Sequence, residues 1–232
     1  MTNARSTHRT RVKICGITRI DDAHAAADAG VDAIGLVFWP GTPRVVTNAQ
    51  ALAIVAALPP YVTVAGLFVD PEAEAVRQTL AAVPIDLLQF HGTEPAAFCR
   101  AFGRRYVKAI AVKEGVDLLE SMSPYDDAAG LLFDAFREGD LPGGTGRAFD
   151  WGRLTADVRA SLVRPLILSG GLDADNVGRA IGIVAPWAVD VSSGVEERDS
   201  NGAPRRGLKD PARIDAFVQG VRSADGRAFA SA

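Results

Sequence analysis

The chain has 232 residues, of which 48% are hydrophobic and 23% are charged, and its formal net charge is -3. These values are ordinary for a globular protein that buries a sizeable core. The small negative charge and the lack of a long basic run argue against nucleic acid as a partner, although they do not exclude a local phosphate site.

The two ends of the sequence are expected to lie outside the folded domain. The first ten residues, MTNARSTHRT, are polar and lack the apolar core of a signal peptide. We expect a disordered tail at 1–10, one domain at 11–222 and a C-terminal tail at 223–232. No segment offers ~18 consecutive apolar residues for a membrane span. The chain is therefore expected to be cytoplasmic, away from membranes, with Cys15 and Cys99 as free thiols.

Short apolar segments typical of strands alternate with helical segments along the chain. The expected strands are 11–17, 32–38, 61–69, 86–91, 106–112, 130–136, 165–171 and 188–195. The expected helices are 21–29, 48–58, 71–82, 94–102, 114–122, 151–161, 173–184 and 210–221. This pattern predicts an α/β fold, a single (β/α)8 TIM barrel. An open doubly wound sheet is the alternative, but no G-x-G-x-x-G motif follows the first strand.

Polar residues inside the expected strands indicate where the chemistry lies. They alternate with apolar residues and should face the lumen, and they are Lys13, Cys15, Gln89, His91, Lys108, Asp134 and Asp190. Cys15 ends the first strand and Asp134 the sixth, so the two side chains should face each other across the barrel mouth. A thiolate and a carboxylic acid can serve as base and acid for proton transfer. A buried cysteine and a capping aspartate are the structural alternatives.

Glycine-rich turns and one arginine predict a binding site for an anionic molecule at the same end. Long or glycine-rich connections at 39–47, 137–149 and 196–207 should lie at the carboxyl end of the strands. Glycines there expose backbone N–H groups to a phosphate, and the expected phosphate-binding residues are Gly144, Gly170, Gly171, Ser192, Ser193 and Gly194. Tight turns explain any single pair of glycines. Arg44 can bind a carboxylate with two nitrogens, or it can simply be solvated.

The histidine inventory argues against a metal centre. The three histidines are His8 in the expected tail, His24 on a helix and His91 on the fourth strand, so only one can reach the mouth. A site with several histidine ligands is effectively excluded, while a carboxylate-bound magnesium ion is not. We therefore expect no metal.

Several motifs together closely resemble the phosphoribosylanthranilate isomerase family. They are KICGIT at 13–18, QFHG at 89–92, LSGGL at 168–172 and VDVSSGVE at 189–196, with FDW at 149–151 and GLKD at 207–210. The resemblance spans residues 12–221. It implies an isomerase of tryptophan biosynthesis that needs no cofactor and takes a small phosphorylated substrate. The implied reaction is the Amadori rearrangement of N-(5-phosphoribosyl)anthranilate to 1-(2-carboxyphenylamino)-1-deoxyribulose 5-phosphate.

The resemblance also implies roles for individual residues. Cys15 corresponds to the general base, Asp134 to the general acid and Arg44 to the residue that binds the anthranilate carboxylate, while His91 and Asp190 are expected to contact the substrate. The cycle needs an ionised thiol and a protonated carboxyl group near neutral pH, and Lys13 can favour the first. A monomer or a homodimer is expected.

Two other functions fit parts of the same pattern. A lysine Schiff-base lyase could use Lys13 or Lys108, because both are expected to face the lumen, and borohydride would then trap its substrate. A phosphate-binding barrel without catalysis would keep the glycine turns and show no turnover.

Overall fold

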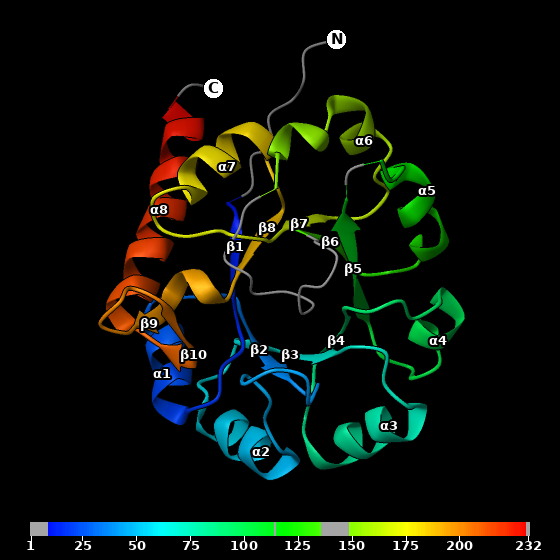
Figure 1. Ribbon diagram of the computed structural model, residues 1–232, viewed down its shortest axis with the longest axis vertical. Coiled ribbons are helices and arrows are strands. Elements are labelled where there is room, and N and C mark those ends of the chain that lie inside the picture. The colour runs from blue at the N-terminus through cyan, green and yellow to red at the C-terminus, as the bar shows by residue number, and fades with distance from the viewer. Residues whose placement is uncertain (1–8, 114, 136–148, 231–232) are drawn as a thin grey trace.

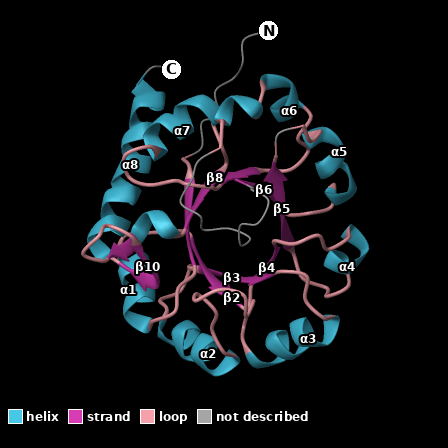
Figure 2. Ribbon diagram, viewed as in Figure 1, coloured by secondary structure: helices cyan, strands magenta, loops and turns pink. Residues whose placement is uncertain are grey.

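Eight parallel strands close into a barrel in the computed structural model, which describes residues 9–113, 115–135 and 149–230. The strands are β1 (Arg11–Cys15), β2 (Ala33–Val37), β3 (Thr63–Phe68), β4 (Leu87–Phe90), β5 (Tyr106–Val112), β6 (Gly130–Ala135), β7 (Leu166–Leu168) and β8 (Ala188–Val191). Each strand pairs with the next, and β8 pairs with β1 to close the ring. Figure 2 shows this ring inside an outer layer of helices. The predicted (β/α)8 barrel is confirmed.

The α-helices follow the strands in alternation, and several are shorter than the sequence predicted. They are α1 (Ile20–Asp28), α2 (Asn48–Ala57), α3 (Ala73–Ala82), α4 (Ala96–Arg100), α5 (Leu118–Met122), α6 (Ala156–Ala160), α7 (Val177–Val184) and α8 (Pro211–Ala230). Capping residues explain two late starts. The Asp117 carboxylate accepts the backbone N–H groups that open α5, and the Thr155 hydroxyl accepts one that opens α6. A separate 3₁₀ turn, η2 (Trp151–Arg153), precedes α6.

Helix α8 runs well beyond the segment where the sequence predicted a helix. It continues to Ala230, through most of the region expected to be a tail (Figure 1). Contacts with the barrel explain the extension: Ala224 is buried, and the Asp225 carboxylate accepts the backbone N–H and the hydroxyl of Thr10 at 2.8 Å each. Arg222 also donates to the Ala29 carbonyl at 2.9 Å. The start of β1 is thereby attached to the last helix.

The segment predicted as a loop at 196–207 instead forms a hairpin. Strands β9 (Glu196–Arg198) and β10 (Pro204–Lys209) pair antiparallel beside the barrel, after a 3₁₀ turn, η3 (Ser193–Val195). The hairpin lies next to α1 in Figure 1, where Arg19 binds Glu197 at 3.1 Å. The predicted loop at 137–149 lies outside the described residues except for Phe149.

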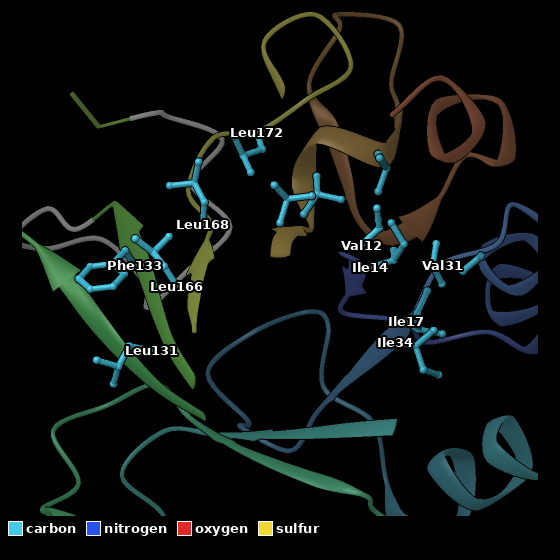
Figure 3. Close-up of a cluster of buried hydrophobic side chains, with 14 of the residues drawn as sticks. Val12, Ile14, Ile17, Val31, Ile34, Leu131, Phe133, Leu166, Leu168 and Leu172 are labelled. Carbon is cyan, nitrogen blue, oxygen red and sulfur yellow. The ribbon is translucent and has the colours of Figure 1, made fainter. Parts of the chain in front are cut away.

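The main core fills the space between the strands and the helices. Figure 3 shows outward-facing side chains of this layer, such as Ile14 of β1, Ile34 of β2 and Leu168 of β7. Inward-facing side chains form smaller clusters in the lumen, including Val107, Ala109 and Leu132 near the amino end of the strands. Apolar and lumen positions therefore alternate along each strand. Within the described ranges, none of the helices is both long and apolar enough to span a bilayer.

Candidate active site

Cys15 is the last residue of β1 and faces the lumen near the carboxyl end of the strands. It packs against Val37 of β2 and Leu67 of β3. Gly35 leaves room for it, because a Cβ atom there would lie 2.8 Å from the Cys15 Sγ and 3.0 Å from the Lys13 Nζ. Burial raises the pKa of the Cys15 thiol above its ordinary value, although the charge of Lys13 acts in the opposite direction. Lys13 thus favours the thiolate, but burial outweighs its effect, so the thiol is held mainly in its neutral form.

Lys13 and Asp190 form a buried ion pair beside Cys15. The Lys13 Nζ lies 2.8 Å from the Asp190 Oδ1, and Lys13 of β1 is directly paired with Asp190 of β8. Burial alone would lower the pKa of Lys13, but the Asp190 carboxylate raises it above the ordinary value. The amine is therefore held as an ammonium ion, which is the wrong state for attack on a carbonyl. This argues against Lys13 as a Schiff-base nucleophile.

On the other side of the lumen, His91 links Asp134 of β6 to Gln89 of β4. The His91 Nε2 lies 3.1 Å from the Asp134 Oδ2, and its Nδ1 lies 3.1 Å from the Gln89 Nε2. The Gln89 amide donates to Nδ1, and this assignment places the ring proton on Nε2, from which it is donated to Asp134. A cavity of about 270 Å³ opens beside this pair, with Ala109 and Ala111 of β5 in its wall. The sequence predicted that His91 and Asp134 would share the mouth, but not that they would bind each other.

The two sides are connected through Asp190. Burial raises the pKa of the Asp190 carboxyl group, the Lys13 ammonium ion lowers it and Asp134 raises it, and Asp190 in turn raises the pKa of Cys15. Along the ring, β1 reaches β6 through β8 and β7. Polar groups thus line the lumen from Cys15 to Asp134 at the carboxyl end of the strands, where barrel enzymes bind their substrates.

The turns after β7 and β8 touch each other beside these residues. Gly170 and Gly171 have φ angles of +84° and +63°, which favour glycine. A Cβ atom at Gly194 would lie 2.0 Å from the Leu172 carbonyl oxygen, so only glycine allows the two turns to approach this closely. Ser192 and Ser193 complete the second turn. Gly144, the remaining predicted phosphate-binding residue, lies outside the described residues.

Arg44 reaches the same region from the loop after β2, but its guanidinium group is already bound by the protein. Its Nε and Nη2 donate to the two carboxylate oxygens of Glu196 at 2.7 and 2.9 Å. Glu196 also accepts from the Lys209 Nζ at 3.3 Å. Neither partner of Arg44 was predicted from the sequence. The segment 196–207 was expected to be a connection after a strand, although a glutamate that directly follows a strand-end turn was a usable signal of a buried ion pair.

Lys108 does not face the lumen, which corrects the sequence prediction. It lies opposite Phe90 and Leu131, two residues of the outer core. Its Nζ binds the Glu94 Oε2 at 3.1 Å and the Gly92 carbonyl at 2.6 Å. The residues on both sides of Lys108 in β5 are apolar, so no polar alternation marks the lumen side of this strand.

We expect replacement of Lys108 by alanine to lower the free energy of unfolding by about 3 kcal/mol, because it leaves the buried Glu94 carboxylate without its cation. Urea denaturation measures this loss. The double variant Lys108→Met/Glu94→Gln removes both charges and should recover a large part of it. A double variant as unstable as Lys108→Ala would contradict this explanation, and borohydride reduction in the presence of substrate should give no lysine adduct in the parent protein.

A metal-binding cluster is also not found in the part of the chain that the structure describes. There, no group of three or more histidine, cysteine, aspartate or glutamate side chains is arranged to hold a metal ion. The polar residues of the mouth instead pair with one another. Their arrangement supports proton transfer and anion binding by side chains.

Comparisons with known proteins point to one family. Residues 12–220 match the family model for N-(5'phosphoribosyl)anthranilate (PRA) isomerase. A relative from Pseudomonas fluorescens is 53% identical over 212 residues, covering 91% of this chain and 95% of the relative. One from Alcanivorax borkumensis is 50% identical over 213 residues, covering 92% and 95%. Both carry the name N-(5'-phosphoribosyl)anthranilate isomerase.

Solved structures agree with the sequence comparisons. The phosphoribosyl anthranilate isomerase of Thermotoga maritima is 35% identical with a TM-score of 0.82, covering 92% of this chain and 99% of that one. A second isomerase structure, in complex with reduced 1-(o-carboxyphenylamino)-1-deoxyribulose 5-phosphate, is 35% identical with a TM-score of 0.79 and the same coverage. On these matches and on the barrel described above, the chain belongs to the N-(5'-phosphoribosyl)anthranilate isomerase family of enzymes.

Proposed function

We propose that this chain converts N-(5-phosphoribosyl)anthranilate to 1-(2-carboxyphenylamino)-1-deoxyribulose 5-phosphate in tryptophan biosynthesis, with Asp134 as general acid and Cys15 as general base. The observation that carries the proposal is the placement of the two groups. Cys15 ends β1 and Asp134 is the second-last residue of β6, so both lie near the carboxyl side of the barrel, three strands apart, with Asp190 on β8 between them. The complex of a related isomerase with a reduced form of this product supports the choice of substrate.

In the first step, Asp134 gives a proton to the furanose ring oxygen. The bond between this oxygen and C1′ breaks, and the nitrogen lone pair forms an iminium ion with C1′. His91 binds the Asp134 carboxyl group at 3.1 Å, so it can hold a proton next to Asp134 between turnovers. No cofactor is needed in this mechanism, because the substrate nitrogen accepts the electrons.

In the second step, the Cys15 thiolate removes the proton from C2′. The C–H electrons form the C1′–C2′ double bond, the nitrogen regains its lone pair, and the resulting enolamine tautomerises to the ketone. Burial opposes ionisation of Cys15, whereas Lys13 favours it. A positive iminium ion next to the thiol acts in the same direction as Lys13, so the first step itself promotes the thiolate that the second step uses.

The two ends of the substrate are bound by different loops in this proposal. The turns that contain Gly170, Gly171, Ser192, Ser193 and Gly194 bind the phosphate together with Gly144, and Arg44 binds the anthranilate carboxylate. Glu196 binds the Nε and Nη2 of Arg44, whereas its Nη1 makes no hydrogen bond to the described residues. This nitrogen is not completely buried, so it can bind a ligand. His91 and Asp190 contact the ribose.

Replacing Arg44 by alanine should raise KM by about tenfold or more and change kcat less, because a carboxylate contact is made equally in the ground state and in the transition state. Steady-state kinetics of the purified variant measure both constants. Arg44→Lys is the matched control. It keeps the charge but not the paired N–H groups that bind Glu196, so it should recover only part of the affinity. A fall in kcat alone would contradict the binding role.

The setting of the enzyme is also part of the proposal. We infer that it works in the cytoplasm, where Cys15 and Cys99 remain free thiols, as they are here. We propose a monomer or a homodimer. One solved structure shows monomers generated from the phosphoribosylanthranilate isomerase of Thermotoga maritima, which is described as dimeric. Light scattering of the purified protein distinguishes the two states.

The decisive experiment is a fluorescence assay that follows the disappearance of phosphoribosylanthranilate with the purified protein. Turnover in the parent, lost in Cys15→Ala, supports the isomerase. A parent that binds phosphate without turnover would instead support the non-catalytic barrel. A lysine adduct trapped by borohydride would support the lyase. We expect none, because Lys13 and Lys108 are both held in ion pairs.

A further inference from the structure

Three charged side chains form a buried cluster behind the barrel mouth, and the proposed proton transfers do not use them. Glu196 and Lys209 are fully buried, and Arg44 is 6% exposed. Glu196 binds the Arg44 guanidinium through both oxygens, and its Oε1 also accepts the backbone N–H of Gly207 at 2.8 Å and approaches the Lys209 Nζ at 3.3 Å. One carboxylate here faces two cations. With Lys209 protonated, the cluster carries a net positive charge beside the site of an anionic substrate.

Lys209 also contacts the turn that we assign to phosphate binding. Its Nζ donates to the Ser192 carbonyl at 3.0 Å and to the Ser192 Oγ at 3.3 Å. The same amine therefore contacts both Ser192 and the carboxylate that orients Arg44. Arg44 and Ser192 approach each other beside Gly16, where a Cβ atom would lie 2.6 Å from the Arg44 Cδ and 3.2 Å from the Ser192 Oγ.

The backbone of Lys209 is fixed from the other side. Its N–H donates to the Asp22 carboxylate at 3.1 Å, and its carbonyl accepts from the Arg19 guanidinium at 3.0 Å. Lys209 is also directly paired with Glu196 across the β9–β10 hairpin. The hairpin and the start of α1 therefore fix the main chain of Lys209. Its amine is thereby positioned to contact both Glu196, which binds Arg44, and the Ser192 turn.

We propose that Lys209 is a positioning residue that holds Arg44 and the Ser192 turn in one arrangement, so that the carboxylate and the phosphate of the substrate are bound by a single preorganised unit. Fixing both contacts before binding lowers the ordering cost that each would otherwise carry. This inference rests on the proposed function, which assigns the substrate carboxylate to Arg44 and the substrate phosphate to the Ser192 turn.

Direct binding of two probes tests the inference without turnover. Calorimetry measures the affinity of the full-length protein for inorganic phosphate and for anthranilate. Lys209→Met, which removes the charge and keeps much of the side-chain stem, should weaken both affinities by about tenfold. Arg44→Ala should weaken anthranilate alone. Lys108→Met is the matched control, because it also removes a lysine from a buried pair with a glutamate but lies far around the barrel on β5, and it should change neither affinity.

A folded Lys209→Met protein with unchanged affinity for either probe would overturn the inference. If this variant does not fold, the pH dependence of binding by Cys15→Ala replaces it. Burial lowers the pKa of Lys209 to about 8, so raising the pH through that value removes its charge. The other charged or titratable groups that face Lys209 are Glu196, Arg44, Cys15, Asp22 and Arg19, and of these only a cysteine ordinarily titrates between about pH 7 and 10. Cys15→Ala removes it.

Affinities for phosphate and anthranilate should therefore fall together in Cys15→Ala as the pH rises through about 8. Flat profiles, or a fall for one probe only, would overturn the inference. Both measurements are independent of catalysis. A parent protein that binds both probes but does not turn over phosphoribosylanthranilate would refute the proposed function and leave the coupling through Lys209 to be judged on the binding data.

Discussion

Cys15→Ala is expected to lower kcat by about three orders of magnitude while leaving substrate binding nearly unchanged, because the variant lacks the group that we propose removes the C2′ proton. The thiol contributes little to binding in our proposal, since the phosphate and the carboxylate are held by other residues. Steady-state kinetics give kcat, and calorimetry with a non-reacting product analogue gives the affinity. The loss should appear in kcat and in kcat/KM alike, which is typical of an interaction made only in the transition state.

The second cysteine provides the matched control for this experiment. Cys99 is fully buried in α4, its Sγ contacts the Glu94 carbonyl at 3.8 Å, and burial raises the pKa of its thiol to about 12. Cys99→Ala should therefore cost stability through lost packing and leave kcat within about twofold. Equal losses of activity in Cys15→Ala and Cys99→Ala would show that the protein is sensitive to core cavities, and would contradict a catalytic role for Cys15.

The barrel was predictable because its repeating unit is visible in the sequence, whereas the hairpin was not. Each strand is a short apolar run between helical segments, and eight such units leave few alternatives. The segment at 196–207 contains glycine, proline and six charged residues, which is typical of a loop. Its strand pairing depends on two buried charges, Glu196 and Lys209, that neutralise each other only in the folded protein. Local sequence preferences do not report such long-range pairing.

The polar lumen was predictable only where alternation along a strand was clear. Lys13 and Cys15 stand on either side of the outward-facing Ile14, and the structure places both in the lumen. The same reasoning failed for Lys108, because the lumen side of β5 is carried by small apolar residues such as Ala109. Lys108 is surrounded by apolar residues along β5, so the sequence does not show which face of the strand it occupies. Its side chain points outward because it pairs with Glu94, which lies just before α4.

Asp134→Asn is expected to lower kcat by about two to four orders of magnitude, because the amide keeps the volume of the side chain but cannot protonate the ring oxygen. It can still bind the His91 ring, so the fold around the site should be retained. Kinetics with phosphoribosylanthranilate measure the loss, and thermal unfolding checks the fold. Asp134→Ala should lose as much activity but also leave His91 without its partner at 3.1 Å.

His91→Asn separates catalysis by Asp134 from positioning by its neighbour. If His91 acts on kcat by orienting the Asp134 carboxyl group and holding a proton near it, its loss should lower kcat by about tenfold, which is less than the loss of Asp134. The loss of His91 should also shift the pH profile of kcat. In the double variant Asp134→Asn/His91→Asn, the effect of the histidine should largely disappear, because it acts through a carboxyl group that is no longer there. A double variant whose losses multiply would show that His91 acts independently of Asp134, and would contradict its role in orienting that carboxyl group.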